Sequence, residues 1–322
     1  MPDAELAYID RVYMTLALDP IHVGTGEHQL ERVDNSIIRD PGTNLPKIPG
    51  TTLTGAFRAY TSLYYANKLL RSTAKQEAQN CAEDPSLGPC TKPTCPVCVT
   101  YGFAQGELGK KGFTSMAQIF DARLLFFPVH SMIGPVWVTS NNSLRELVDA
   151  NVLSEDELAI KLSSNSNQIQ TALKKDKLNL GWFLLPIKES ASPITPGAME
   201  KLKNMGISSS ILERLILVSD KLFANVVNSN LEIRTSTAID PVTGSSKEGA
   251  LFTYEAIPRS TVLWFNIVYK DPRNFKIDGQ EIDFDREWIV ENVKFALKYC
   301  EYLGVGGMVT RGMGRIRILN PN

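Results

Sequence analysis

Segments typical of strands alternate along this chain with segments of helical periodicity, and this alternation limits the folds that the chain can adopt. Residues 11–19 (RVYMTLALD) and 261–269 (TVLWFNIVY) are apolar and β-branched, as expected of buried strands. Residues 120–140 contain two apolar runs separated by polar residues and glycine, which indicates a pair of strands. The connections contain the glycine and proline clusters of hairpin turns. The pattern predicts an α+β fold with an antiparallel sheet.

Two long helices are expected among these strands. Pro49-Gly50 ends a loop, and Thr51 or Thr52 is a suitable N-cap for a helix that continues to about Leu70. Asp285 is placed to cap a second helix, which runs to about Tyr302. Cys300 falls on the helical pattern and is expected in the core.

Composition excludes several classes of protein. The 322 residues are 43% hydrophobic, which is enough for a core, and the formal net charge is −1. A net charge this close to zero does not attract the chain as a whole to polyanions, so any nucleic-acid surface must be a local basic patch. No apolar stretch is long enough to span a bilayer, and the first residues lack the basic start of a signal peptide. We expect a soluble, cytoplasmic protein without a membrane partner.

The chain is interpreted as a single domain, 1–322, with two departures from a compact body. Residues 71–115 are predicted to be a cysteine-bearing insertion. Residues 231–257 are predicted to form a hairpin, because two strand-like arms flank the turn-rich tip DPVTGSSKEG. A hairpin with so polar a tip is expected to protrude.

A glycine-rich run, GVGGMVTRGMGR, occupies residues 304–315 between a predicted helix and a predicted strand. Glycine allows the backbone to approach a phosphate, and Arg311 and Arg315 can donate charge-assisted hydrogen bonds to it. The run does not match the dinucleotide-binding pattern G-x-G-x-x-G. The alternative interpretation is a helix C-cap followed by a tight turn.

Asp34 and His22 are the candidate catalytic groups. Asp34 lies in the loop ERVDNSIIRD, where a carboxylate can hold a metal ion or accept a proton from a ribose hydroxyl. The alternative is a turn-capping aspartate or an ion pair with Arg32. His22 adjoins a glycine turn and is a candidate RNA contact, although such histidines are more often structural.

Four cysteines are crowded into a short segment: Cys81, Cys90, Cys95 and Cys98. The C-P-V-C spacing lets two thiolates bind one tetrahedral zinc ion, and the site would be structural. The other two cysteines do not follow a standard finger spacing, so a disulfide or free thiols are alternatives.

These motifs occur in an order that resembles the RAMP proteins of type III CRISPR effector complexes. The sequence carries IHVGTG, VDNSIIRDPGTNLPKIPGTTLTGAFR, CPVC, LLFFPVHSMIGPVWVTS, EIRTSTAIDPVTGSSKEGALFTYEAIP and GVGGMVTRGMGR over nearly its whole length. The FFPVHS segment and the length are most similar to the backbone subunit of the Cmr (type III-B) complex. VDNSIIRDP is also similar to the Csm (type III-A) backbone subunit, which is the near alternative.

The resemblance implies an architecture and a set of partners. It implies a ferredoxin-like, RNA-recognition-type core with insertions, and a projecting thumb hairpin at residues 231–257. Several copies of the subunit would assemble as a filament along a guide RNA, together with other subunits of the complex, and pair the guide with single-stranded target RNA.

The resemblance also implies site residues. Asp34 matches the aspartate essential for target cleavage, which requires a divalent metal ion such as Mg or Mn. His22, a further catalytic candidate, matches the position before the family's glycine turn. Glu255 lies in the segment after the thumb, where family members place acidic and aromatic residues that assist cleavage, and the adjacent Tyr254 is the alternative to Glu255. Thr54 stands where many relatives carry a lysine that touches the guide, and Arg58 is a candidate replacement. The expected RNA-binding residues are Gly50, Thr52, Thr54, Arg58, Arg39, Gly306, Gly307, Arg311, Gly312 and Arg315.

Three hypotheses of function follow. The first is a metal-dependent endoribonuclease that binds guide RNA as a backbone subunit and cuts the target at regular intervals. Its hairpin would unstack one nucleotide, so that the ribose 2′-hydroxyl aligns with the next phosphorus. The second is a non-catalytic, architectural RNA-binding subunit of the same complex. The third is an unrelated metabolic enzyme that holds a phosphorylated ligand in the glycine-rich run.

Overall fold

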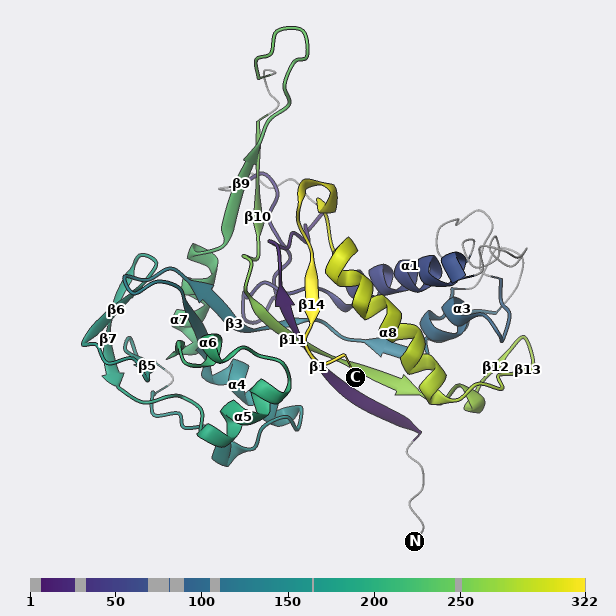
Figure 1. Cartoon of the computed structure of the whole chain (residues 1–322), viewed down its shortest axis with the longest axis horizontal. Coiled ribbons are helices and arrows are strands. Elements are labelled where there is room, and N and C mark those ends of the chain that lie inside the picture. The colour runs from purple at the N-terminus through teal and green to yellow at the C-terminus, as the bar shows by residue number, and fades with distance from the viewer. Residues whose placement is uncertain are drawn as a thin grey trace.

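A large sheet with helices on its faces and one projecting hairpin makes up the protein (Figure 1). The structure is a computed structural model that describes residues 7–26, 33–68, 81, 90–104, 111–163, 165–246 and 251–321. The main sheet has the strand order β14-β1-β11-β3-β4-β8-β5-β7-β6, and β2 also pairs with β11. Its strands are β1 (Tyr8–Ala17), β2 (Ala117–Ile119), β3 (Arg123–Val129), β4 (Val136–Ser140), β5 (Ile169–Thr171), β6 (Lys177–Leu180), β7 (Phe183–Glu189), β8 (Leu215–Val218), β11 (Val262–Lys270) and β14 (Ile316–Ile318). The α+β class predicted from the sequence is confirmed.

The sheet is mixed, so the prediction of an antiparallel sheet was wrong. The pairing of β1 with β11 and of β3 with β4 is antiparallel, as expected. However, β4 pairs with β8 in parallel, and so does β5 with β7. The reason lies in the connection after β4. The chain passes through α4 (Asn141–Asp149) and further elements before β8, and a long crossover allows a parallel neighbour.

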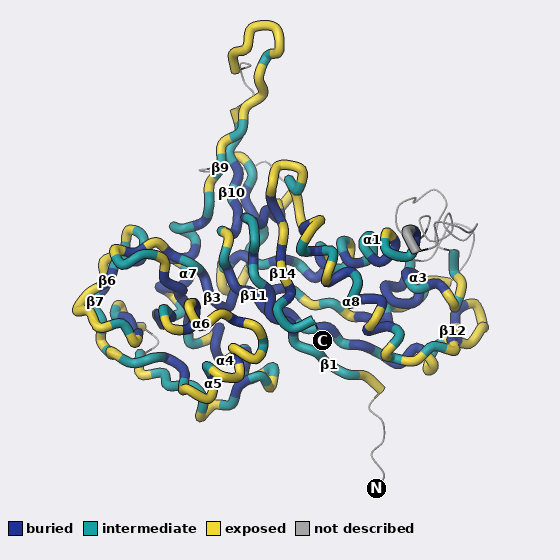
Figure 2. Tube along the Cα trace, viewed as in Figure 1, coloured by how far each residue is buried: buried dark blue, intermediate teal, exposed yellow. Residues whose placement is uncertain are grey.

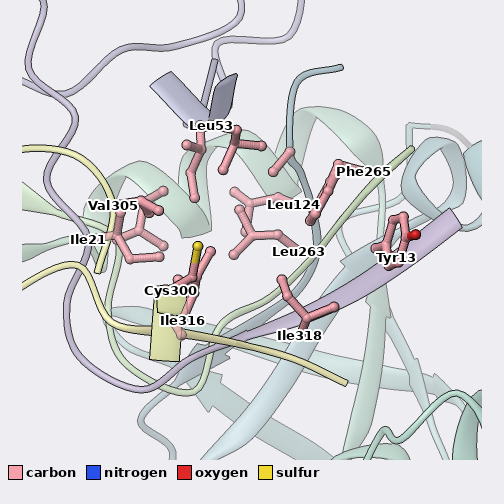
Figure 3. Close-up of a cluster of buried hydrophobic side chains, with 14 of the residues drawn as sticks. Tyr13, Ile21, Leu53, Leu124, Leu263, Phe265, Cys300, Val305, Ile316 and Ile318 are labelled. Carbon is pink, nitrogen blue, oxygen red and sulfur yellow. The ribbon is translucent and has the colours of Figure 1, made fainter. Parts of the chain in front are cut away.

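Two long helices, α1 (Gly50–Lys68) and α8 (Arg286–Leu303), pack against each other on the side of the sheet formed by β14, β1 and β11 (Figure 1). Tyr64 of α1 stacks on Phe295 of α8, with ring centroids 3.6 Å apart. Side chains from these helices and the strands beneath form the main core, which includes the fully buried Cys300 (Figure 3). The prediction of Cys300 as a core residue is confirmed.

The rest of the main sheet carries shorter helices: α4, α5 (Pro196–Asn204), α6 (Ser209–Leu212) and α7 (Asp220–Ser229). A second apolar cluster lies beneath α4, α5 and α6, and buried segments run through both halves of the body (Figure 2). A short two-stranded pair, β12 (Lys276–Ile277) and β13 (Gln280–Glu281), lies at the opposite end of the body from β6 and β7. None of the described helices is both long and apolar enough to cross a membrane.

Helix α1 begins at Gly50, and its N-terminus is satisfied from a distant part of the chain. The Gly50 N–H donates to the Asp121 carboxylate at 2.8 Å, whereas Thr51 or Thr52 was predicted to cap this end. A Cβ at Gly50 would lie 2.5 Å from the Ile119 carbonyl oxygen, so only glycine allows the helix to start this close to β2. The predicted cap of α8 is correct, because the Asp285 carboxylate accepts from the Trp288 N–H.

The segment 231–257 contains β9 (Glu232–Ser236) and β10 (Phe252–Ala256), which pair as an antiparallel hairpin that projects from the body (Figure 1). Residues 247–250 near its tip lie outside the described residues. Much of the segment 71–115 also lies outside them, namely 71–80, 82–89 and 105–110. Its described part includes α3 (Pro96–Tyr101), which packs against α1 and α8.

Candidate active site and adjoining groove

Strand β10 brings the predicted site residues together at the base of the hairpin. Successive side chains of a strand point to opposite faces, and here each face contacts a different part of the site. On one face Phe252 and Tyr254 pack towards the glycine-rich run in a small apolar cluster with Met313. On the other face Thr253 and Glu255 contact the loop that carries Asp34. The hairpin base is therefore continuous with the candidate active site.

Thr253 fixes the position of Asp34. The Thr253 N–H and hydroxyl both donate to Asp34 Oδ2, at 2.7 and 2.9 Å, and the hydroxyl accepts from the Asp34 N–H at 3.1 Å. The next residue, Asn35, continues this contact by forming a parallel bridge with Tyr254. Asp34 itself is exposed, so its carboxylate is both oriented and accessible to a ligand.

His22 lies behind this strand and is buried. Its Nδ1 is 2.6 Å from the Glu255 carbonyl oxygen, and its ring meets the Tyr254 ring edge to face, with centroids 5.9 Å apart. The His22 carbonyl accepts from the Gly307 N–H at 2.8 Å. His22 therefore joins the hairpin base to the glycine-rich run.

The carboxylate of Glu255 forms an ion pair with Arg39, another predicted site residue. One Arg39 nitrogen lies 3.0 and 2.8 Å from the two Glu255 oxygens, and these side chains are only 22% and 13% exposed. The remaining Arg39 donors reach the Asn228 side chain and the Ile37 carbonyl. Arg39 was predicted to bind RNA and Glu255 to assist cleavage, but the structure gives each the other as its partner. Their RNA-directed roles stay predictions.

A groove of about 470 Å³ separates the start of α1 from the glycine-rich run. Thr52, Gly306 and Gly307, all predicted to bind RNA, lie on its walls. Its lining consists of Val23, Gly24, Thr52, Ala56, Ala59, Tyr60, Gly304, Val305, Gly306, Gly307 and Val309. None of these carries a formal charge, so the groove offers backbone and small side chains to a ligand.

Two glycines of the glycine-rich run have different structural reasons, one of them the close fit of the run against the His22 segment. Gly306 has a φ of +83°, and a Cβ there would lie 2.5 Å from the His22 carbonyl oxygen. Gly304 has a φ of +76° and is the C-cap of α8, so the alternative interpretation of a helix cap also holds. A cap and a groove wall are compatible functions of one loop.

The other predicted residues of this run lie outside the groove lining. Arg311 stacks over the Phe252 ring at 5.1 Å, and so connects the run to β10. Arg315 forms an ion pair with Asp19, and this hydrogen bond lowers the pKa of Asp19. Gly312 ends a short 3₁₀ turn with a φ of +75°. Among these, the half-exposed Arg315 already has a carboxylate partner, and its phosphate contact stays a prediction.

Two residues of α1 that were predicted to bind RNA have protein partners. The Thr54 hydroxyl donates to the Gly50 carbonyl at 2.7 Å. The Arg58 guanidinium donates to the Cys81 carbonyl at 2.8 Å and to the Gly102 carbonyl at 2.6 Å. Arg58 therefore ties α1 to the cysteine-bearing segment, and nothing in its geometry favours the phosphate contact suggested by the missing lysine.

The four clustered cysteines form a set of ligands suited to a metal ion. Their sulfur atoms all lie within 4.8 Å of one another. The Sγ atoms of Cys90 and Cys98 are 3.8 Å apart, and those of Cys81 and Cys95 are 3.7 Å apart. Tetrahedral zinc with bonds of about 2.3 Å requires sulfur separations of about 3.8 Å. The predicted disulfide alternative is not present, since none of the five cysteines, all of them in the described part of the chain, forms a disulfide bond.

The electrostatics of the cluster agree with metal binding. Hydrogen bonds from Cys81 and its neighbours lower the pKa of Cys90, whereas contact with Cys81 and Cys90 raises the pKa of Cys95. Four thiols this close cannot ionise independently, because each new thiolate repels the next. A bound cation would remove that conflict by stabilising every thiolate.

The surroundings of Asp34 differ from the cysteine cluster. The described residues around Asp34 do not supply a group of three His, Cys, Asp or Glu ligands. Mg²⁺ is commonly held by one or two carboxylates together with water and substrate phosphates. Among the described residues, Asp34 alone could hold such an ion only if ligands from outside the protein completed its coordination.

Comparison with known proteins identifies the family. Residues 16–317 match the RAMP superfamily. The chain belongs to the RAMP superfamily. Among curated relatives, the CRISPR system Cmr endoribonuclease Cmr4 of Pyrococcus furiosus is 26% identical over 97% of this chain and 95% of its own length. The CRISPR system Cms endoribonuclease Csm3 of Methanothermobacter thermautotrophicus is 31% identical, but over 29% of this RAMP chain and 33% of its own length.

Solved structures share the fold of this RAMP protein. A chain of the type III-B Cmr-beta complex in its apo state superposes with a TM-score of 0.63 and 15% identity, covering 96% of both chains. A chain of Cmr-beta bound to cognate target RNA superposes with a TM-score of 0.58 and 16% identity, covering 97% of this chain and 98% of that one. The resemblance stated from the motifs is thereby confirmed, and similarity extends further for Cmr4 than for Csm3.

Some residues of the RAMP site were not singled out from the sequence. Thr253 and Phe252 contact Asp34 and Arg311, yet both resemble ordinary strand residues. Asn228 holds Arg39 from α7, a helix that the sequence did not predict. Strand alternation around Glu255 was a usable signal for Thr253, because residues two apart share a face.

Proposed function

We propose that this RAMP protein is a backbone subunit of a type III CRISPR effector complex that binds guide RNA and cleaves the paired target RNA at regular intervals. The observation that carries the proposal is the similarity to the Cmr4 endoribonuclease along nearly the whole of both chains. The oriented, exposed carboxylate of Asp34 at the base of β10 supports it independently.

We assign the parts of the fold as follows. The strands β14, β1, β11 and β3 with helices α1 and α8 form the ferredoxin-like, RNA-recognition-type core. The hairpin β9–β10 is the thumb, and the cysteine-bearing segment 71–115 is an insertion. The groove between α1 and the glycine-rich run holds guide RNA by its backbone, because glycine permits close approach there. Base pairing, and not the protein, then reads the sequence.

The proposed reaction is an attack by a ribose 2′-hydroxyl on the adjacent phosphorus. The thumb inserts into the guide–target duplex and unstacks one target nucleotide, which costs a few kcal/mol but brings the hydroxyl in line. The 2′-oxygen forms a bond to phosphorus and the bond to the 5′-oxygen breaks, and the departing 5′-oxygen takes a proton from water, leaving a cyclic phosphate and a 5′-hydroxyl. Asp34, held by Thr253, accepts the proton of the attacking hydroxyl.

A divalent ion such as Mg²⁺ or Mn²⁺ would be held by Asp34 with RNA phosphate oxygens, and it would neutralise charge that develops on the phosphate. His22 keeps the Glu255 backbone and the glycine-rich run in register. The largely buried pair of Arg39 and Glu255 sets the distance between the Asp34 loop and the thumb. In this proposal His22 and Glu255 assist cleavage by holding the elements around Asp34 in place.

The cysteine cluster is proposed as a structural zinc site that orders the insertion. Its sulfur separations support this assignment, and Arg58 transmits the order of the cluster to α1. The proposed partners are guide RNA, single-stranded target RNA, further copies of this chain and other subunits of the complex. The assembly would act in the cytoplasm.

The deciding experiment compares wild type with Asp34→Ala in the assembled, guide-loaded complex, with and without a chelator. We expect Asp34→Ala to assemble normally and to lose regular cleavage of the target, and we expect chelation of the wild type to have the same effect. Unchanged cleavage by Asp34→Ala would leave the architectural subunit as the better description. Failure of the wild type to bind single-stranded RNA in a salt-dependent manner would reject both the nuclease and the architectural subunit.

A further inference from the structure

The hairpin of β6 and β7 exposes an aromatic and cationic face that the proposed function does not use. Trp182 occupies the turn between the strands and is 91% exposed, and Leu184 in β7 is 59% exposed. The opposite face of this hairpin is apolar and contributes Leu178, Leu180 and Leu185 to the main core. Alternation along the strands therefore fixes which side chains point to solvent.

Lysines lie along and just before this hairpin, some residues away from Trp182 at its turn. Lys177 pairs in register with Pro186 on the outward face, and Lys188 follows two residues later on the same side. Lys174 and Lys175 precede β6 and are exposed. In the part of the chain that the structure describes, none of these four lysines has a carboxylate within ion-pair distance. The face defined by Trp182, Lys177, Leu184 and Lys188 is called the hairpin face below.

The hairpin face adjoins the root of the thumb. Gly181 lies so close to Asn230 that a Cβ there would be 2.3 Å from the Asn230 Oδ1. Asn230 ends α7, and β9 of the thumb begins two residues later. The same helix holds Arg39 through Asn228, at 2.8 Å. A short run of contacts thus connects Trp182 with the loop that carries Asp34.

From these observations we infer that the hairpin face binds single-stranded RNA, with a base stacked on Trp182 and phosphates beside Lys177 and Lys188. An exposed aromatic ring with unpaired cations further along the same outward face suits a single strand of several nucleotides, because every base has a π-face and every linkage a charge. The site is separate from the groove at the glycine-rich run. The inference rests on the proposed function for the source of this RNA, which would be the target strand at the root of the thumb.

Charge complementarity favours RNA over a protein partner for this face. The lysines would approach a polyanion without losing any existing ion pair, whereas burial of four unpaired ammonium groups in a protein interface would be costly. A second copy of this chain, docked through Trp182 and Leu184, is the competing occupant. The experiment below separates the two.

Tryptophan fluorescence reports directly on this site. Of the four tryptophans, Trp137 and Trp264 are buried and Trp288 is stacked on Phe284, so Trp182 is the exposed one. We expect a short oligoadenylate to quench the emission of the full-length chain, and we expect this quenching to be absent in Trp182→Phe. Equal quenching in both proteins would overturn the inference.

Binding measurements complete the test. Trp182→Ala should weaken oligoadenylate binding at the hairpin face about 5- to 100-fold, the range found for loss of one stacked base. Lys177→Ala with Lys188→Ala should lower the salt dependence of that binding by about two phosphate contacts, one for each lysine. Lys298→Ala, an exposed lysine of α8, is the matched control and should behave as wild type. If Trp182→Ala instead abolishes self-association in sedimentation and leaves RNA affinity unchanged, the face binds another copy and the inference fails.

Discussion

The Thr253 hydroxyl accepts a hydrogen bond from the Asp34 N–H and donates one to the Asp34 carboxylate, so a single side chain orients the proposed catalytic group. Thr253→Val keeps the shape of the side chain and removes both contacts. Loss of one hydrogen bond to a charged group costs about 1.5–3 kcal/mol, so cleavage by the assembled complex should slow about 10- to 100-fold. Single-turnover rates at saturating target RNA measure this effect.

Two further variants separate orientation of Asp34 from stability of the thumb. Thr253→Ser retains the hydroxyl and should cleave near the wild-type rate. Thr235→Val alters the residue directly opposite Thr253 in the hairpin and should also leave the rate unchanged. If Thr235→Val slows cleavage as much as Thr253→Val, the hydroxyl acts only by stabilising the hairpin.

The ion pair of Arg39 and Glu255 should contribute strongly to folding because both side chains are largely buried. Glu255→Leu or Arg39→Met leaves one charge without its partner, which should destabilise the protein by about 2–3 kcal/mol. The double variant should lose much less free energy of unfolding than the two single variants lose together. Denaturant unfolding of all four proteins measures this coupling.

The exposed pair of Lys276 and Glu281 gives the control for that cycle, and its two replacements should add independently. Guide-RNA affinity provides a second readout. If Arg39→Met weakens RNA binding while the unfolding cycle shows no coupling, Arg39 is an RNA contact, as the sequence predicted, and the pair is incidental.

The cysteine cluster should bind one zinc ion per chain. Cys95→Ser removes a ligand and should abolish stoichiometric zinc in elemental analysis, and chelation should lower the melting temperature of the wild type. Cys300→Ala is the control, because Cys300 is buried outside the cluster and should leave zinc content unchanged. Zinc-free wild-type protein with an unaltered melting temperature after chelation would contradict the assignment.

Sequence reasoning succeeded where a local pattern determines the structure. Three features were predicted in this way: the strand β11, the Asp285 cap of α8 and the clustering of the four cysteines. Each of them depends on residues that are near one another in the sequence. The family motifs also led to Asp34, which lies at the hairpin base. These features need no knowledge of distant contacts.

Features that depend on distant contacts were not predicted. The cap of α1 comes from Asp121, 71 residues after Gly50, and no local signal distinguishes it from Thr51 or Thr52. The Arg58 guanidinium donates to two backbone carbonyls. Every residue has such a carbonyl, so no residue type in the sequence indicates this contact. Short strands such as β5 in the middle of the chain are stabilised by their sheet neighbours, so their periodicity is weak.

The Asp121 cap predicts a pH dependence of stability. Partial burial raises the pKa of Asp121, but hydrogen bonds from Lys47 and the Gly50 N–H outweigh it, and the net pKa lies below the usual value. The stabilisation is therefore complete above the unfolded-state pKa of about 4 and is lost as pH falls through the lower folded-state pKa. Asp121→Ala should cost about 1 kcal/mol at pH 7, and this difference from wild type should shrink below about pH 4.

The matched control is Asp149→Ala, which removes an exposed carboxylate at the end of α4. Its effect on unfolding should be small at neutral pH. Denaturant unfolding of the three proteins at several pH values makes the comparison. A destabilisation by Asp121→Ala that persists unchanged at pH 3 would show that the carboxylate charge is not its cause.

Gly306 of the glycine-rich run should not tolerate alanine, whereas Gly279, in the turn between β12 and β13, should. Gly306 and Gly279 both have φ near +80°, but a Cβ at Gly306 would lie 2.5 Å from the His22 carbonyl oxygen, and a Cβ at Gly279 would meet no atom within 4 Å. Both alanine variants carry the strain of positive φ, about 1 kcal/mol. Gly306→Ala must also displace the run from His22, which deforms the groove, so guide-RNA affinity should fall at least 10-fold in filter binding while Gly279→Ala binds normally. Equal affinity in the two variants would show that RNA does not use this groove.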